Sequence, residues 1–531
     1  MGVGGGSGAG AGSPPMPGGG GRREGLGMSR FKRVLIVLGS VAAVFLAAVG
    51  GLFAWQWTGA EVSTVGQVRF SKELKVPPLA PSTVEKDGTR VFSLRMQAGT
   101  TEFEKGVRTP TWGFNGSYLG PTLRAKRGEK VRVKVENTLP EASSVHWHGM
   151  HLPAKMDGGP HQEVAPGRTW TPYWKIDQPA ATLWYHPHPH GKTETHVQRG
   201  LAGMFLVDDD RSASLKLPKR YGVDDLPVAV QDVEFDGANL DHGRRSFLQN
   251  TGFLGSRTMV NGTLDPYKEV GDELVRLRLL NASTARIYDF GFGDDRAFAL
   301  VATDGGLLER PETLKRVQLS PGERAEVVVR MRAGEKVVLR SFPQSNYGGG
   351  FEQRFAGGDD SFDVLELRAA PTLRKAPELP SVMGDLEVPQ EKDAVRGRYF
   401  GLRMSGINGR KMDMRHIDET VTRGTAEVWT VRNEDGVPHN FHVHDVQFRV
   451  LSVDGKAPTG MLRGAKDTVF VPGGSTVKLA MRFDGPADPD TPYMYHCHLL
   501  YHEDRGMMGQ FVVVEKGQRA GTVAGGAHAG H

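Results

Sequence analysis

Short segments in which apolar and polar residues alternate recur along most of the chain. Clear cases are residues 131–137, 275–281 and 428–433, each of which ends in asparagine. Alternation with period two, bounded by glycine and proline, predicts a β-strand with one face toward a core. Many such short strands indicate β-sandwiches, so we predict an all-β chain.

The turn residues between these segments repeat three times. Asn-Gly pairs begin at residues 115, 261 and 408, and Pro-Gly pairs begin at residues 166, 321 and 472. A chain of 531 residues is also too long for a single hydrophobic core. We therefore predict three sandwich domains, with a Pro- and charge-rich linker before the last and a flexible tail after it. The domains are at residues 66–215, 222–370 and 396–516, the linker at 371–395 and the tail at 517–531.

One uncharged run near the N-terminus breaks the alternating pattern. Residues 34–57 contain no charged side chain and are long enough to span a bilayer, and the basic residues before them favour a cytoplasmic N-terminus. We predict a disordered, basic-flanked cytoplasmic segment at 1–33 and a transmembrane anchor at 34–57. A cleaved signal segment is the alternative. Both predict that the domains lie outside the cytoplasm, either anchored in the cell membrane or secreted.

The charges exclude some functions. The formal net charge is +5, and lysine and arginine alternate with apolar residues along the predicted strands, which is typical of a solvated sandwich face. Since there is no basic stripe and no nucleic-acid motif, we expect no nucleic-acid partner. The chain has one cysteine, Cys497, so it cannot form an internal disulfide.

Histidines occur in pairs separated by one residue. Random placement of 18 histidines in 531 positions would give fewer than one such pair, whereas the chain has five, at 146/148, 186/188, 188/190, 442/444 and 496/498. On a strand, both members of a pair lie on one face. One pair alone is typical of an exposed polar face, but four pairs together supply eight imidazoles, enough to bind several copper ions. Zinc is less favoured, because structural zinc sites use several cysteines.

Cys497 stands between His496 and His498. On a strand its thiolate faces away from both imidazoles, so that three consecutive residues would join two metal sites. Such a bridge suits electron transfer. His439, Cys497, His502 and Met507 are together the ligand types of a blue-copper centre. Met507 could instead fill the core, and the neighbouring Met508 could take its place.

The four histidine motifs resemble those of the multicopper oxidases. His-Trp-His-Gly (146–149), Trp-Tyr-His-Pro-His (184–188), His-x-x-His-x-His (439–444) and His-Cys-His-x₃-His-x₄-Met (496–507) match that family in order and spacing. The resemblance covers roughly residues 66–515 and is greatest to the three-domain bacterial branch of cuprous oxidases, laccases and bilirubin oxidases. It implies three cupredoxin-like Greek-key domains and four copper ions.

The resemblance also assigns roles to residues. It implies a type 1 copper held by His439, Cys497, His502 and Met507, a type 2 copper held by His146 and His442, and a binuclear type 3 pair held by His148, His186, His188, His444, His496 and His498. Asp157 and Glu503 match the acidic residues that supply protons to the copper cluster. The segment directly after Asn281, residues 282–289, contains no histidine, so we expect a copper-free middle domain that acts as a spacer, while the first and third domains share the cluster.

The implied function is that of an exported oxidase. It would couple four one-electron oxidations of a small reducing substrate to the reduction of O₂ to two H₂O. We favour a laccase-like reaction on phenols or aromatic amines, which would dock at an exposed edge near His439. Cu(I) is the alternative substrate, although the region of the methionine-rich insertion of cuprous oxidases offers only Met404, Met412 and Met414 here. A remote alternative is a scaffold protein without enzymatic activity, a role taken by superfamily members that have lost copper ligands.

Overall fold

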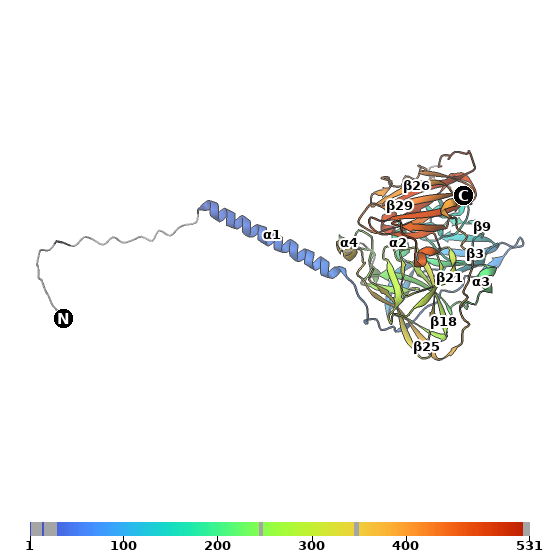
Figure 1. Cartoon of the computed structure of the whole chain (residues 1–531), viewed down its shortest axis with the longest axis horizontal. Coiled ribbons are helices and arrows are strands. Elements are labelled where there is room, and N and C mark those ends of the chain that lie inside the picture. Colours follow the sequence, from blue (N-terminus) through green and yellow to red (C-terminus); the bar gives the residue numbers. More distant parts are fainter. Residues whose placement is uncertain (2–12, 15–28, 244–247, 345–349, 524–531) are drawn as a thin grey trace. The chain divides into compact units, whose positions relative to one another are not determined.

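The computed structural model describes residues 1, 13–14, 29–243, 248–344 and 350–523 (Figure 1). The chain divides into two compact units, Met1–Gln56 and Trp57–His531. Every strand among the described residues lies in the second unit. Most of the predicted disordered segment and half of the predicted tail lie outside the described residues.

Helix α1 (Arg30–Ala60) contains the uncharged run. It is 31 residues long with a mean hydropathy of 2.5 in its most apolar part, and none of its residues is buried. By length and composition it can cross a membrane, as a signal segment also could. The helix begins at Arg30, so residues 30–33 are helical and do not belong to a disordered segment.

The first β-sandwich packs two sheets around one apolar cluster, in which Phe92, Val133, Leu183 and Phe205 are buried. Its first sheet has the order β2-β3-β6-β8, with β4 beside β3 and β9 beside β6, and its second sheet the order β5-β11-β10-β7. The strands are β2 (Thr83–Val84), β3 (Arg90–Glu104), β4 (Val107–Phe114), β5 (Leu123–Lys126), β6 (Lys130–Asn137), β7 (His146–His148), β8 (Thr169–Trp170), β9 (Tyr173–Lys175), β10 (Ala181–His186) and β11 (Gly203–Asp208).

The middle sandwich has sheets ordered β1-β17-β25-β24-β19-β22 and β16-β15-β12-β18-β23-β20-β21, with a separate β13-β14 hairpin. The strands are β1 (Lys72–Glu73), β12 (Asp225–Val233), β13 (Phe235–Asp236), β14 (Asn239–Leu240), β15 (Arg257–Val260), β16 (Thr263–Leu264), β17 (Pro266–Asp272), β18 (Leu274–Asn281), β19 (Tyr288–Phe292), β20 (Phe298–Thr303), β21 (Gly306–Leu314), β22 (Val317–Leu319), β23 (Arg324–Arg330), β24 (Lys336–Phe342) and β25 (Phe362–Arg374). Its two sheets share one buried cluster.

The last sandwich has sheets ordered β27-β26-β29-β34-β31-β32 and β28-β36-β35-β30-β33. The strands are β26 (Ala394–Arg403), β27 (Gly406–Ile407), β28 (Glu419–Thr422), β29 (Thr425–Asn433), β30 (His439–Val443), β31 (Phe448–Val453), β32 (Ala465–Lys466), β33 (Thr468–Val471), β34 (Thr476–Phe483), β35 (Asp488–His496) and β36 (Met508–Val514). Short helices connect strands: η1 (Ala154–Met156), η2 (Pro160–Gln162), α2 (Thr193–Gln198), α3 (Asp210–Ser214), α4 (Gly350–Phe355), η3 (Glu391–Asp393), η4 (Gly460–Arg463) and α5 (Leu500–Glu503). The prediction of an all-β chain is confirmed.

The structure explains the asparagine that ends the repeated strand. Asn137, Asn281 and Asn433 are fully buried. Each side-chain amide donates to a carbonyl four or five residues later and to another just before the Pro-Gly turn, at 2.7 to 3.0 Å. Each buried asparagine therefore ties the loop that follows its strand to the Pro-Gly turn of the same sandwich. In the first and last sandwiches, that loop leads to the histidines.

Two expectations differ from the structure, one about the exposure of a strand and one about a domain boundary. Strand β18 is buried on both faces and does not form a solvated face, because Arg276 and Arg278 pair with Glu326 of the neighbouring strand β23. The predicted first domain at 66–215 also contains residues of the middle sandwich, since β1 pairs in parallel with β17. The remaining domain boundaries stay predictions.

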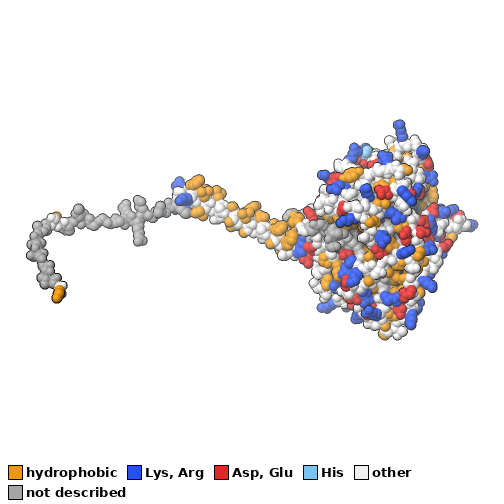
Figure 2. All heavy atoms as spheres, viewed as in Figure 1, with side chains coloured by type: hydrophobic (Ala, Val, Ile, Leu, Met, Phe, Trp, Pro, Cys, Tyr) orange, Lys and Arg blue, Asp and Glu red, His pale blue; other side chains and the backbone are white. Residues whose placement is uncertain are grey.

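The surface has mixed charge. On the face of the second unit that Figure 2 shows, blue Lys and Arg side chains are interspersed with red Asp and Glu side chains. Many charged side chains of the described residues are paired, as in the part-buried contact of 2.8 Å between Arg90 and Glu129. Pairs at the surface contribute little to stability.

Candidate metal centre

Strand pairing brings the histidine pairs together. Strand β7 pairs with β10 so that His146 lies opposite His186. In the last sandwich, β30 pairs with β35 so that His442 lies opposite His496. Each sandwich therefore presents two pairs at the end of one sheet.

The two sets of imidazoles meet in one buried cluster, in which no residue is more than 1% exposed. The Nε2 atom of His496 lies 3.2 Å from Nε2 of His188 and 3.2 Å from Nε2 of His444. The Nε2 atoms of His186 and His498 are 3.4 Å apart. The eight members are His146, His148, His186, His188, His442, His444, His496 and His498.

The hydrogen bonds of two histidines fit a bound cation. The Nδ1 atoms of His146 and His442 lie 3.0 and 2.9 Å from the carbonyl oxygens of Asp157 and Asp467, so Nδ1 carries the proton. The Nε2 atoms of both rings are buried without a hydrogen-bond partner. A buried lone pair with no donor is costly, and a metal ligand has this arrangement.

Two of these imidazoles, those of His188 and His498, are held in the neutral form. Burial lowers the pKa of His188 and of His498 to about 3. Their lone pairs are therefore available at physiological pH. Neutral imidazole is the form that binds copper.

A second cluster surrounds the cysteine. The Sγ atom of Cys497 lies 3.7 Å from Nδ1 of His439 and 3.6 Å from Nδ1 of His502. Both rings are fixed from behind, since Nε2 of His439 contacts Asp435 at 3.1 Å and Nε2 of His502 donates to the Asn250 carbonyl at 2.7 Å. Burial raises the pKa of the Cys497 thiol to about 12, so a cation is needed to favour the thiolate.

The side chains alternate as predicted, although strand β35 ends at His496 and Cys497 and His498 lie just beyond it. The Cys497 sulfur faces His439 and His502, while its neighbours His496 and His498 face the eight-imidazole cluster. A bridge of three consecutive residues therefore joins the clusters.

Met507 lies at the second cluster. Its side chain is buried and belongs to the same apolar cluster as Cys497, and its carbonyl accepts a hydrogen bond of 3.1 Å from the Cys497 amide. Met508 is the first residue of β36 and pairs with His496 across the sheet. Met507 and not Met508 is therefore the methionine whose backbone is bonded to Cys497.

The substrate edge predicted near His439 is not formed by His439 itself. The imidazole of His439 is fully buried. The side chain of Asp435 is 23% exposed and lies between His439 and solvent. Asp435 is held in this position because its carboxylate accepts a hydrogen bond from Nε2 of His439.

Both predicted carboxylates touch the eight-imidazole cluster. Asp157 Oδ2 lies 2.7 Å from Nδ1 of His444. Glu503, at the end of α5, lies 3.1 Å from Nδ1 of His496 and 3.4 Å from Nδ1 of His188. Burial alone would raise the pKa of Glu503, but the two imidazoles outweigh it and hold the pKa well below its ordinary value.

Other histidines near the motifs have ordinary roles. His190 is exposed. His161 contacts the Gln510 side chain at 2.9 Å, and His151 contacts Gln447. None of the three belongs to the possible metal-binding groups of the described residues.

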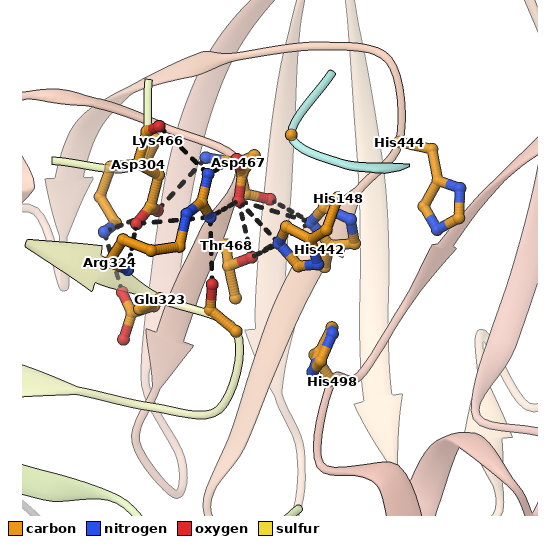
Figure 3. Close-up of polar contacts among 12 residues, drawn as sticks. His148, Asp304, Glu323, Arg324, His442, His444, Lys466, Asp467, Thr468 and His498 are labelled. Carbon is orange, nitrogen blue, oxygen red and sulfur yellow. Dashed lines mark hydrogen bonds and ion pairs between the residues drawn. The ribbon is translucent and has the colours of Figure 1, made fainter. Parts of the chain in front are cut away.

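The sequence missed several polar residues beside the cluster (Figure 3). Asp467 and Thr468 each lie 3.1 Å from Nε2 of His148. Arg324 of the middle sandwich holds Asp467 at 2.6 Å. Gly322 lies so close that an added Cβ would be 3.1 Å from the His148 ring, so the middle sandwich is more than a spacer. Gly322 belongs to a repeated Pro-Gly pair, but no histidine or motif marks Arg324, Asp467 or Thr468 in the sequence.

The chain is similar to known proteins. Two family models described as multicopper oxidase match residues 95–212 and 380–517. The chain is 35% identical over 447 residues to the multicopper oxidase mco of Staphylococcus haemolyticus, covering 83% of this chain and 92% of that protein. It is 36% identical over 456 residues to the cell division protein FtsP of Photorhabdus laumondii, covering 85% and 95%. The structure of the laccase-like multi-copper oxidase CueO from Ochrobactrum sp. matches with 36% identity and a TM-score of 0.76, covering 83% and 100%.

Cupredoxin-like sandwiches with buried histidine clusters define a class of copper proteins, and the predicted fold class is confirmed. The chain belongs to the multicopper oxidase family. The family implies copper, and the histidine clusters fit copper sites.

Proposed function

We propose that the chain binds four copper ions and acts outside the cytoplasm as a laccase-like oxidase. The ligands of the type 1 copper would be His439, Cys497, His502 and Met507, those of the type 2 copper His146 and His442, and those of the type 3 pair His148, His186, His188, His444, His496 and His498. Bound copper supplies one-electron redox chemistry and the site where O₂ is reduced to water.

The bridge at Cys497 carries this proposal. Its sulfur lies in the cluster with His439 and His502, and its two neighbours lie in the other cluster. The link between the clusters is covalent and short. Such a link gives single electrons a path from a site near the surface to a buried site.

Asp157 and Glu503 would hold and deliver protons. Reduction of O₂ to two H₂O consumes four protons, and the cluster is sealed from solvent. Each carboxylate contacts the Nδ1 atom of a cluster imidazole. This contact fixes the ring and keeps a carboxylate oxygen beside the cluster. Positioned acids and bases of this kind contribute about 10² to 10⁴ in rate.

The reductant would meet the protein at Asp435. This carboxylate reaches solvent and bonds the His439 imidazole directly. A carboxylate can accept the proton of a phenol as the phenol loses an electron. The relative from Ochrobactrum has oxidase activity towards lignin model compounds, which supports an organic substrate.

Cu(I) is the second candidate substrate. The backbone amide of Met404 donates to Asp435 at 2.5 Å, so a methionine lies next to the carboxylate. Thioether sulfur is a soft ligand that suits Cu(I), so a methionine at this position favours Cu(I) as an alternative substrate. Only one methionine makes this contact among the described residues, so we favour the phenol.

Oxygen uptake by the copper-loaded full chain in detergent tests the substrate. We expect rapid uptake with 2,6-dimethoxyphenol and slow uptake with chelated Cu(I). A strong preference for Cu(I) would instead identify a copper-oxidising enzyme. No uptake with either, together with no bound copper, would support a scaffold role without enzymatic activity. The likeness to the cell division protein FtsP motivates this alternative.

We also propose that α1 remains as a membrane anchor. Its apolar length exceeds that of ordinary signal segments, and basic residues precede it. Mass spectrometry of the exported protein would reveal an intact N-terminal helix. A mature protein that starts after residue 45 would show cleavage.

A further inference from the structure

A buried ionic network joins the middle sandwich to the candidate copper cluster (Figure 3). Asp304, Glu323 and Arg324 come from the middle sandwich, and Lys466 and Asp467 from the last one. All five are at most 1% exposed. Burying five ionisable groups without pairing would be prohibitive, so their contacts explain their presence.

Arg324 uses all five of its N–H donors. Its two terminal nitrogens donate to the Asp467 carboxylate at 2.7 and 2.6 Å and also to the carbonyls of Gly322 and Asp304. Its Nε donates to the Thr182 carbonyl at 2.9 Å. Thr182 lies on β10, the strand that ends at His186. One guanidinium therefore binds all three sandwiches.

Asp467 in turn accepts hydrogen bonds from two of the cluster histidines. Its Oδ1 accepts a hydrogen bond of 3.1 Å from Nε2 of His148, and its carbonyl accepts one of 2.9 Å from Nδ1 of His442. A carboxylate can only accept, so the proton of His148 is on Nε2 and its Nδ1 is free to face the cluster. Thr468 donates to Asp467 at 2.9 Å and lies 3.1 Å from both rings.

Asp467 itself is poorly placed to bind copper. It lies close enough to His148 and His442 to form a possible metal-binding group with them. Both of its oxygens, however, are occupied by the Arg324 fork. Its carboxylate is therefore a support for the ligands.

We propose that Arg324 and Asp467 form a positioning pair that sets the two halves of the copper cluster in register and selects the ring nitrogen that His148 presents to it. This inference rests on the proposed function, because it assigns supports to the proposed ligands. The middle sandwich then contributes to copper binding without supplying a ligand. Outer partners of metal ligands typically change metal affinity about 10- to 100-fold.

Copper binding by Arg324→Met tests the pair in the full-length protein. The matched control is Arg276→Met, which breaks a similarly buried ion pair with Glu326 in the same sheet. We expect Arg324→Met to raise the dissociation constant of the type 2 copper about 10- to 100-fold in a chelator series. Its type 2 electron paramagnetic resonance spectrum should also change, while the blue absorbance is kept. Arg276→Met should lose stability but keep the copper affinity and the spectrum.

Two further variants keep the test decisive if Arg324→Met folds poorly. Arg324→Lys keeps the charge beside Asp467 but loses the fork, and Arg324→Met/Asp467→Leu removes both charges together. Both should fold and still bind the type 2 copper more weakly with an altered spectrum. Wild-type affinity and spectrum in either would overturn the proposal. Absence of four bound copper ions in the unaltered protein would instead refute the proposed function.

Discussion

The outer nitrogen of His439 is bonded to the carboxylate of Asp435, and Asp435 is the residue of the two that reaches solvent. A reductant that approaches this side therefore meets a carboxylate before it meets an imidazole. The chemistry of that carboxylate should decide which reductants are used.

Replacement of Asp435 should affect the reductant most. A charge-assisted hydrogen bond contributes about 1.5 to 3 kcal/mol, so Asp435→Ala should lower kcat/KM for 2,6-dimethoxyphenol about 10- to 100-fold. Steady-state oxygen uptake measures the effect. Glu434→Gln is the control, since Glu434 bonds Arg403 and Tyr399 and makes no bond to His439. Equal values for both variants would argue against contact with the reductant.

Replacement of Glu503 should slow the reaction with O₂. Because Glu503 is held anionic between His188 and His496, Glu503→Gln removes a proton carrier but keeps the shape. We expect reoxidation of the fully reduced protein to slow by about 100-fold or more in stopped flow, with the blue absorbance retained. Asp157→Asn should behave similarly. Glu515→Gln, at an exposed carboxylate, serves as the control, and unchanged reoxidation in Glu503→Gln would contradict the role.

Cys497→Ser should separate the two clusters chemically. A hydroxyl is a poor ligand for copper in a site built around sulfur, so the blue absorbance should disappear. The eight-imidazole cluster does not use the sulfur and should keep its copper. Metal analysis should therefore find one copper ion fewer per chain, and loss of all copper would contradict the division into two sites.

The middle sandwich should weaken in acid. Burial would raise the pKa of Glu326, but Arg276 and Arg278 outweigh it and lower the pKa from 4.5 to about 2. A carboxyl with a lowered folded-state pKa stabilises above its unfolded value, and this stability is lost as the pH falls from about 4.5 toward 2. The contribution is about 3 kcal/mol at neutral pH.

Denaturant unfolding of the copper-free protein measures this effect. Glu326→Gln should be less stable by about 3 kcal/mol or more at pH 7, because two arginines lose a buried partner. The difference from the unaltered protein should shrink at pH 3. A difference that does not depend on pH would exclude linkage through Glu326.

The proposed ligands could be predicted from the sequence because the histidines of each pair are one residue apart at a strand or just past its end. The supports were not visible. Arg324 and Asp467 are 143 positions apart, and each is an ordinary charged residue until the fold joins them. The role of Asn440 could not be predicted either. Its side chain accepts a hydrogen bond of 2.5 Å from the His498 amide and donates one of 2.9 Å to the Pro321 carbonyl.

The alternation of polar and apolar residues also gave wrong predictions of exposure at particular residues. Strand β18 has the polar and apolar alternation of a half-exposed strand, yet Arg278 lies inside the protein because Asp225 and Glu326 neutralise it. The burial of His439 could not be predicted either, since it depends on a hydrogen bond with a loop carboxylate. Period-two patterns predict which side chains share a face, whereas tertiary pairing decides whether that face meets water.

The division of the cluster between the first and last sandwiches has a consequence for biosynthesis. The proposed ligands run from His146 to His498, so during synthesis or export the first sandwich emerges with only its own half of the proposed site. If the proposed assignment holds, stable copper binding would require the last sandwich to fold against the first. Metal insertion would then follow folding in the compartment where both sandwiches meet.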